Sequence, residues 1–509
     1  MTGVRANSNK YLLRADLFAD TWGFADVEAA VNAIQEWISH TKWQGIPVDV
    51  DKWLVSGHSN GGQGTWYALT HRPDKVFAAA PVSGYLSIQC KLKYVANVHL
   101  PGLTLLVYVP YHLWQPMEPS KRAIVESSTA SYRHELLASN AKGIPILQQH
   151  GSADDNVPAY HSRFMHQALA ATGTNSTYNE LPGQGHWFDG VMTTEALSAF
   201  YREQFRRNPN NSITGMDFEI TVANPGNMGS KAGVKAVQLS VPGRLGKIRA
   251  RISQTGSAYT LETTNILAIE IQIIHGLPDV VSIDGQDIHV SGIHSGPALG
   301  FTKNKDGQWE ISDLPLFPSG LWFRRGRQLG AMDAILATKG AFLIKASGSG
   351  AVDTALQISR NMYQYFSADS RLIAEKVEEK DESSGNQISV IVGGNVNRSS
   401  GPASFPVEIK EGHVRVRDAS GFWHNYGTKG GVAAIYLSPL EGERLELVVW
   451  GVDAAALAMA ARLVPMMTGV GQPDFVILSK SGGWRGADGA LAMGFFDHKW
   501  DVSTNSVFA

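Results

Sequence analysis

The chain has 509 residues, which at about 150 residues per domain is room for roughly three domains. Its 44 basic and 46 acidic side chains leave a net charge of -2, so no field of one sign favours nucleic acid or an anionic membrane as a partner. The single cysteine, Cys90, excludes an internal disulfide framework and a multi-thiolate metal centre. We therefore expect a globular protein without metal or cofactor, whose chemistry comes from oxygen and nitrogen side chains.

Neither the first residues nor the most apolar stretch of the chain has the pattern of an export or membrane segment. Residues 1–19 lack the apolar block of a signal peptide. The apolar stretch at 100–114 is interrupted by prolines and is too short to cross a bilayer. These features predict a soluble protein with no membrane partner, either cytoplasmic or, if an upstream signal is missing, secreted. They leave the oligomeric state open.

Helix and strand patterns alternate through the first part of the chain, residues 1–206. Apolar residues between Asp26 and Ile38 recur at helical spacing, as in a helix that lies on a core. The alternation of strands and helices predicts a mostly parallel, doubly wound sheet, and the segment 89–142 is expected to be an insertion over that sheet. Further helices are predicted at 63–71 and 159–172, and strands at 52–56, 77–82, 144–148 and 176–181.

The pattern changes after residue 206, which we take as the end of the first domain. From 207 to 330, short apolar runs alternate with polar residues at a period of two, which predicts an antiparallel β domain. Between 331 and 509, strands and helices alternate again and predict a C-terminal α/β domain, with the charged run 375–384 as a solvated loop. The elements predicted in this last domain are strands at 342–345, 388–392, 445–450 and 475–478 and helices at 353–366 and 453–464.

A serine with the surroundings of a nucleophile follows the first predicted strand. The sequence Gly57-His58-Ser59-Asn60-Gly61 fits the Gly-x-Ser-x-Gly nucleophile elbow in its required context of strand, sharp turn and helix. Glycines are needed where the strand and the helix cross closely, and the turn holds the hydroxyl at a helix N-terminus. Without this context the pentapeptide would be an ordinary Gly-rich turn. We predict Ser59 as the nucleophile and the Asn60 backbone N–H as one oxyanion donor.

A serine hydroxyl is a poor nucleophile at neutral pH, so it needs a base, and the base needs an oriented partner. In folds with this elbow the order along the chain is Ser, acid, His, with the last two in loops after later strands. Asp154 and His186 each follow a predicted strand in that order. His58, next to the nucleophile, is expected to point away from it. Asp155 is the alternative acid and otherwise a candidate cap for the next helix.

The segment His150-Gly151-Ser152-Ala153-Asp154-Asp155-Asn156-Val157-Pro158 resembles the acid loop of the prolyl oligopeptidase family of serine peptidases, a branch of the α/β-hydrolases. The Ser59 elbow and Gly185-His186 match this family as well. In that family the first Asp of the pair completes the triad, so the resemblance implies Asp154. It also implies a substrate-binding role for Asn156, whose position helps to bind substrate in some dipeptidyl peptidases.

More narrowly, three segments are similar to a large fungal subgroup usually labelled prolyl-oligopeptidase-like. They are Trp22-Gly23-Phe24, the run 155–163, and Gly185-His186-Trp187-Phe188-Asp189-Gly190. The similarity covers about residues 20–206. It implies a serine-type peptidase or a related acyl hydrolase.

The segment before Ser59 departs from the pattern of the family. An α/β-hydrolase places several strands before its elbow and draws one oxyanion donor from an early Gly-rich loop. Here the preceding residues contain one clear helix, no such loop and no propeller. We therefore expect the chain to be the C-terminal part of a longer hydrolase whose sheet is missing its first strands.

We predict a serine hydrolase of the prolyl oligopeptidase type that cleaves peptide bonds through Ser59, Asp154 and His186 and an acyl-enzyme. Its expected partners are peptide or small acyl substrates. The alternatives are a carboxylesterase that acts on small acyl esters and an inactive hydrolase-like binding protein. The motifs do not separate peptidase from esterase.

Overall fold

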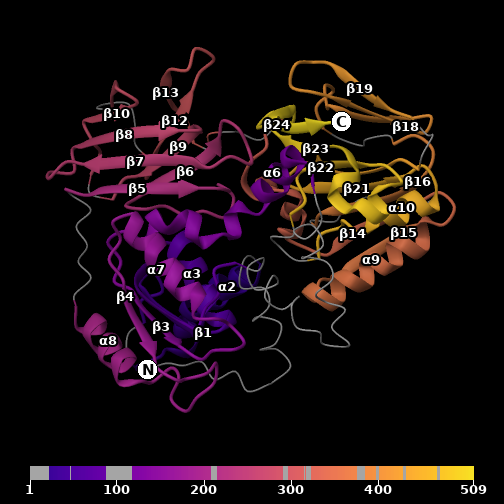
Figure 1. The fold of residues 1–509 in the computed structure, drawn as a ribbon. Coiled ribbons are helices and arrows are strands. Elements are labelled where there is room, and N and C mark those ends of the chain that lie inside the picture. Colours follow the sequence, from indigo (N-terminus) through magenta and orange to yellow (C-terminus); the bar gives the residue numbers. More distant parts are fainter. Residues whose placement is uncertain are drawn as a thin grey trace.

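The computed structural model describes residues 22–45, 48–87, 117–207, 215–274, 276–290, 296–314, 316, 322–374, 385–396, 401–427, 431–466 and 471–509. Three groups of sheets follow one another along the chain, from indigo for the first to yellow for the last (Figure 1). Within these ranges no helix has the length and the apolar composition to cross a membrane. The predicted charged loop at 375–384 and residues 89–116 of the predicted insertion lie outside the described residues.

The first sheet and its helices consist of α2 (Trp22–Thr41), β1 (Trp53–His58), α3 (Asn60–His71), β2 (Val76–Val82), β3 (Leu147–Gly151), α7 (Tyr160–Ala171), β4 (Thr177–Leu181) and α8 (Glu195–Arg206). The strands are parallel and pair in the order β1-β2-β3-β4. Successive side chains of a strand point to opposite faces. Ala79 packs on one face with residues of α3 and α7, whereas Ala80 packs on the other with Leu197 of α8. The predicted doubly wound parallel sheet is confirmed.

Helix α2 forms where its apolar spacing predicts it, but the expectation that its apolar face lies on a core is only partly right. Phe24, near its first residue, is buried in the core of the first sheet. Val27 and Trp37 are 48% and 52% exposed. The helix is held at its first turns, where Glu28 accepts hydrogen bonds from Arg72 Nε and Nη2. Helical periodicity identifies an apolar face, but it does not show what covers that face.

The middle of the chain forms two packed sheets with strand orders β11-β10-β8-β7-β5 and β13-β12-β9-β6. Their strands are β5 (Asp217–Val222), β6 (Val234–Leu239), β7 (Gly246–Ile252), β8 (Ala258–Thr264), β9 (Ile266–Gln272), β10 (Val280–Ile283), β11 (Gln286–His289), β12 (Ala298–Lys303) and β13 (Trp309–Ser312). Inward-facing residues such as Ile220, Ile248 and Ile269 form a common core. The pairs of described strands are antiparallel except β8 with β10, so the predicted antiparallel β region is confirmed.

Buried polar contacts join this β region to the first sheet's helices. The Nζ of Lys231 donates to the carbonyls of Asn140 and Lys142 at 2.8 and 2.9 Å, at the end of the 3-10 helix η3 (His134–Ala141). Asn140 Nδ2 also donates to the Thr221 carbonyl, and the Thr221 N–H donates back to Asn140 Oδ1. Hydrogen-bond donors and acceptors come from both sides, so the two regions form a specific interface.

The last sheet has eight strands in the order β15-β14-β16-β21-β20-β22-β23-β24. Its elements are β14 (Phe342–Ser347), α9 (Ala351–Phe366), β15 (Ser370–Ala374), β16 (Gln387–Val392), β20 (Ala433–Pro439), β21 (Leu445–Gly451), α10 (Ala454–Ala461), β22 (Phe475–Leu478), β23 (Ala490–Phe496) and β24 (Val502–Phe508). The first four strands are parallel, as the predicted α/β pattern requires. The other pairings are antiparallel, which the sequence did not predict.

A smaller sheet and several short helices complete the last part of the chain. The small sheet pairs its strands antiparallel, in chain order. These elements are the strands β17 (Val407–Lys410), β18 (His413–Arg417) and β19 (Trp423–Tyr426), the helix α11 (Gly482–Arg485), and the 3-10 helices η4 (Gly326–Gln328), η5 (Met332–Leu336) and η6 (Gly486–Gly489).

The described part of the predicted insertion begins with α6 (Pro119–Ser128), followed by the 3-10 helices η2 (Ala130–Tyr132) and η3. The sequence predicted that this segment lies over the first sheet, but helix α6 lies beside β23 and β24 (Figure 1). Its residues Ile124 and Val125 are buried in the core of the last sheet, and its Lys121 Nζ donates to the Asp488 carbonyl at 2.9 Å. The insertion therefore links the first and last parts of the chain.

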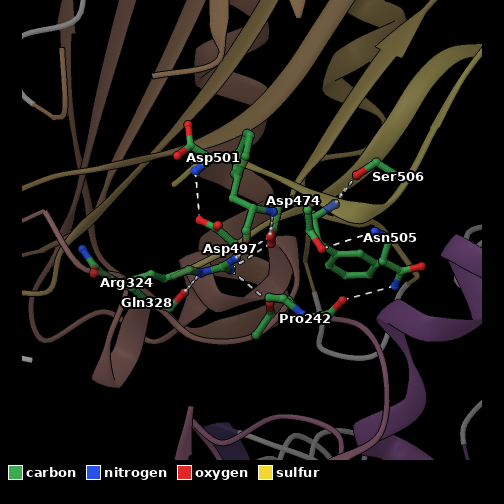
Figure 2. A network of polar contacts seen from close by, with 12 residues as sticks. Pro242, Arg324, Gln328, Asp474, Asp497, Asp501, Asn505 and Ser506 are labelled. Carbon is green, nitrogen blue, oxygen red and sulfur yellow. Dashed lines mark hydrogen bonds and ion pairs between the residues drawn. The ribbon is translucent and has the colours of Figure 1, made fainter. Parts of the chain in front are cut away.

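A buried ion pair lies beneath the last sheet, and Figure 2 shows its surroundings. The Arg324 side chain is 1% exposed, and Nη1 and Nη2 donate to the two carboxylate oxygens of Asp474. The Phe496 N–H donates to Asp474 Oδ2 at 2.8 Å. The guanidinium also donates to three backbone carbonyls, those of Gln328, Gly330 and Phe496. Both charges are thus buried and hydrogen-bonded.

Two buried histidines lie between α3 and η3. The His71 ring stacks on Tyr67 with a centroid distance of 3.9 Å, and the His134 ring stands edge-on to it at 6.2 Å. Gln63 Nε2 lies 2.9 Å from Nε2 of His134. Burial lowers the pKa of both imidazoles, for His134 to about 3. The positive charge that each could carry is further disfavoured at His71 by His134 and Arg72.

This pair predicts a loss of stability in acid. Below the ordinary histidine pKa of about 6.5, these histidines bind protons in the unfolded chain but not in the folded chain. Each histidine therefore lowers the free energy of unfolding by up to about 1.4 kcal/mol for each pH unit of acidification. For His134 the effect extends down to a pH of about 3. Urea unfolding at several pH values should give a shallower pH dependence for His134→Gln than for the wild type. His289→Gln, at the exposed end of β11, should keep the wild-type slope. Equal slopes for the wild type and His134→Gln would contradict the expectation.

Candidate active site

Ser59 occupies a strained turn between β1 and α3. Its backbone has φ 59° and ψ -116°, a region that side-chain-bearing residues rarely adopt. A Cβ at Gly57 would lie 2.3 Å from the Gly61 carbonyl oxygen, so only glycine allows the strand to approach the helix this closely. The Ser59 N–H donates to the Val82 carbonyl at 2.9 Å. The turn has the geometry that the elbow sequence predicts.

Asp154 and His186 lie beside this turn, at the same edge of the sheet. Nδ1 of His186 is 2.7 Å from Asp154 Oδ2, and Nε2 of His186 is 3.0 Å from Ser59 Oγ. The loop that carries His186 packs against the end of β3, because a Cβ at Gly151 would lie 2.4 Å from the Gln184 carbonyl oxygen. The three side chains thus form one hydrogen-bonded chain from three separate loops.

The Asp154 carboxylate is held in one orientation and kept ionised. Its Oδ1 accepts hydrogen bonds from the backbone N–H groups of Asn156 and Val157 at 3.0 and 2.7 Å. Burial alone would raise the pKa of Asp154, but hydrogen bonds from His150, His186 and the Val157 N–H outweigh it and hold the pKa well below its usual range. An ionised acceptor therefore faces Nδ1 of His186 at neutral pH.

His58 supports the loop of His186. Its Nε2 lies 2.9 Å from the His186 carbonyl oxygen, which can only accept, so Nε2 is the protonated nitrogen. The two imidazole rings lie 4.6 Å apart, and the Trp187 ring lies 4.3 Å from His58. Burial, followed by the positive charge that His186 can carry, lowers the pKa of His58. A neutral His58 leaves His186 as the group that can take up a proton.

The sequence of this region matches a known family. Residues 15–207 match the family model described as the prolyl oligopeptidase family. This part of the chain is a prolyl oligopeptidase family domain. An uncharacterized secreted protein of Arthroderma benhamiae is 35% identical over 500 residues, which are 96% of this chain and 51% of that protein. The chain therefore spans about half the length of this relative.

Two solved structures align with parts of the chain. The acylaminoacyl peptidase of Pyrococcus horikoshii is 17% identical with a TM-score of 0.26, over 38% of this chain and 30% of its own. A puromycin-hydrolyzing peptidase of Mycobacterium tuberculosis is 21% identical with a TM-score of 0.25, over 38% of this chain and 26% of its own.

The remaining residues that the sequence predicted differ in how they lie around the candidate site. Asp155 is exposed, and the next helix, α7, has no side-chain cap, so its expected capping role is wrong. Asn156 is also exposed, and its backbone N–H contacts Asp154. Asn60 is the first residue of α3. Among the described residues no group of three His, Cys, Asp or Glu side chains could hold a metal ion.

Two residues that lie next to the candidate site were not identified from the sequence. His150 lies 3.3 Å from Asp154 through its Nε2, and Trp187 is 72% exposed beside the His186 ring. Both stand in the segments that carry the family resemblance, His150 four residues before the acid and Trp187 directly after the base. Their closeness in sequence to Asp154 and His186 was the available signal, but it does not show which side chains point toward the site.

Proposed function

We propose that the prolyl oligopeptidase family domain is a serine hydrolase that cleaves peptide bonds through an acyl-enzyme on Ser59. The observation that carries the proposal is the hydrogen-bonded chain from Ser59 Oγ through His186 to Asp154, with distances of 3.0 and 2.7 Å. These are the distances at which a base and its orienting acid activate a serine hydroxyl. The family membership of residues 15–207 supports the same reaction class.

In the first step Ser59 Oγ attacks the substrate carbonyl carbon while Nε2 of His186 takes up the hydroxyl proton. Asp154 accepts a hydrogen bond from Nδ1–H of His186, which keeps Nε2 free as the acceptor and stabilises the imidazolium. His186 then returns the proton to the leaving amine. Water then attacks the ester carbonyl of the acyl-enzyme while His186 takes up a proton from the water. His186 returns this proton to Ser59 Oγ as the ester bond breaks.

The negative charge that develops on the carbonyl oxygen needs donors nearby. Asn60 is the first residue of α3, so its backbone N–H lies at a helix N-terminus, where the helix dipole favours a negative charge. We assign it as an oxyanion donor. Asn156, exposed beside the acid, is assigned to substrate binding, and the exposed Trp187 ring offers an apolar wall for the substrate.

The proposal extends to the partners and the location of the protein. The substrate is a peptide or a small acyl compound, and no nucleic acid or membrane takes part. The A. benhamiae relative is named a secreted protein, and we propose that this protein also acts outside the cell.

A fluorophosphonate probe tests the function, because it reacts with serines that an adjacent base activates. The full chain should be labelled, and Ser59→Ala should abolish the labelling. The matched control is Ser198→Ala on α8, which should be labelled like the wild type, because the Ser198 hydroxyl has the Thr193 carbonyl as its one partner in the described part of the chain. A folded wild-type chain that takes up no probe would overturn the proposal. Hydrolysis of peptide amides compared with short acyl esters then distinguishes a peptidase from a carboxylesterase.

A further inference from the structure

Behind Asp154, on the side away from the nucleophile, lies a second histidine that the reaction described above does not use. His150 belongs to β3, and its side chain is fully buried. Its Nε2 is 2.7 Å from the Val157 carbonyl oxygen and 3.3 Å from Asp154 Oδ2. Its Nδ1 is 2.7 Å from the hydroxyl oxygen of Ser162, a buried residue of α7. Every polar atom of this imidazole therefore has a partner.

These partners allow one tautomer of a neutral imidazole. A backbone carbonyl can only accept, so Nε2 of His150 carries the proton and donates it to the Val157 carbonyl, while Asp154 Oδ2 lies 3.3 Å from the same nitrogen. Nδ1 then has a lone pair and accepts from the Ser162 hydroxyl. The other neutral tautomer would point a lone pair at two oxygen atoms. The Val157 carbonyl thus fixes the tautomer, and Ser162 holds the ring in place from its other side.

The Oδ2 atom of Asp154 is consequently shared between two imidazoles. His186 donates to it from the side of the nucleophile at 2.7 Å, and the protonated Nε2 of His150, which is bound to α7 through Ser162, lies 3.3 Å from it. Since Oδ1 already accepts two backbone N–H groups, all directions around the carboxylate are occupied. A donor on Oδ2 holds the carboxylate in place and withdraws part of its negative charge from His186.

We propose that His150, fixed by Ser162, is a positioning residue that holds Asp154 toward His186 and weakens its pull on the proton of His186. The catalytic meaning of this role rests on the proposed function. The arrangement keeps His186 oriented and limits the negative charge that Asp154 places against its Nδ1–H.

Other titratable groups surround His150. His58 ends β1, His186 follows β4, and Glu180 of β4 stands opposite His150 in the strand pairing. The Glu180 carboxylate is bound by Arg163 of α7 and by the Tyr178 hydroxyl. These partners hold the pKa of Glu180 at about 2, chiefly through the hydrogen bond from Arg163. Glu180 therefore keeps one charge at neutral and mildly acidic pH.

The test measures the titration of His186 in His150→Leu, His150→Gln and Ser162→Ala. Selective ¹³C labelling of the histidine Cε1 atoms gives one resonance for each of the 16 histidines, and a His186→Gln variant identifies the resonance of His186. Loss of the His150 donor in His150→Leu should raise the titration midpoint of His186 by about half a pH unit or more. It should also lower kcat about tenfold and move the acid limb of kcat/KM in the same direction. Ser162→Ala should shift the midpoint in the same direction, but less.

His150→Gln provides the rescue, because its side-chain Nε2 can donate from nearly the same place. It should bring the midpoint of His186 and most of the activity back to the wild-type values. The matched control is His166→Leu. His166 lies on α7 with Ser162, but it bonds Ser176 and not Asp154. In this variant the titration midpoint of His186 and the activity should both equal those of the wild type. An unchanged midpoint in His150→Leu, or a glutamine that fails to restore it, would overturn the inference. The titration of His186 can be measured without turnover. If the wild type took up no probe, the proposed function would be refuted, and the titration midpoints of His186 would still decide the role of His150.

Discussion

Replacement of Asp154 by asparagine is expected to lower kcat about 10⁴-fold. The structure predicts how the amide would be oriented, because the oxygen at the Oδ1 position must accept the N–H groups of Asn156 and Val157. The amide nitrogen would then occupy the Oδ2 position, 2.7 Å from Nδ1 of His186. A donor there forces the proton of His186 onto Nε2, where it faces Ser59 Oγ and prevents proton uptake. Steady-state hydrolysis and the rate of probe labelling measure the loss.

Asp155→Asn is the matched control for this variant, because it makes the same chemical change one residue further along. Asp155 is exposed, and its carboxylate lies outside the hydrogen-bonded chain that joins Ser59, His186 and Asp154. We expect its kcat to stay within about twofold of the wild type, as for a surface change away from the site. Loss of activity in Asp155→Asn, with little change in Asp154→Asn, would show that Asp155 and not Asp154 is the acid.

Arg324→Ala is expected to lower the free energy of unfolding by about 3–5 kcal/mol. It would leave the buried Asp474 carboxylate without its cation, and of its donors among the described residues the Phe496 N–H alone would remain. The carbonyls of Gln328 and Gly330 would lose their donor as well. Urea unfolding followed by tryptophan fluorescence suits this site, since the guanidinium lies 5.1 Å above the Trp500 ring.

An exposed ion pair of the same type provides the comparison. Arg249 lies 3.7 Å from Asp217 with both side chains about half exposed, so Arg249→Ala should change stability by less than about 1 kcal/mol. The expected difference between the two variants comes from burial and not from the loss of an arginine. Similar losses in Arg249→Ala and Arg324→Ala would contradict the assignment of Arg324 as a buried structural ion pair.

The candidate site could be predicted because its residues lie at chain positions that a parallel sheet brings together. Ser59, Asp154 and His186 each follow a strand, and the carboxyl ends of parallel strands meet at one edge. His150 could not be assigned in the same way. Its role depends on the phase of α7, which turns the Ser162 hydroxyl toward the imidazole, and on the path of the acid loop around Val157.

The fold was predictable where one face of an element is polar. The β region follows an alternating pattern, as in β7, where buried and exposed residues alternate throughout. The antiparallel half of the last sheet has no such signal, because β20 and β21 are buried at every position and read as continuous apolar runs. The position of α6 depends on contacts with elements more than 350 residues further along, such as β23 and β24 and the hydrogen bond from the Glu118 N–H to Asp488 of η6. Local spacing carries no information about a partner at that distance.

The packing of α6 has a consequence for how this protein can be divided. A fragment that stops at residue 206 would contain the whole hydrogen-bonded chain of the site, yet Ile124 and Val125 would be exposed to water and the core of the last sheet would lose part of its cover. Catalytic and C-terminal parts are thus interlocked, although hundreds of residues separate them along the chain. Exchange of either part between related proteins would have to bring the matching helix or the matching sheet with it.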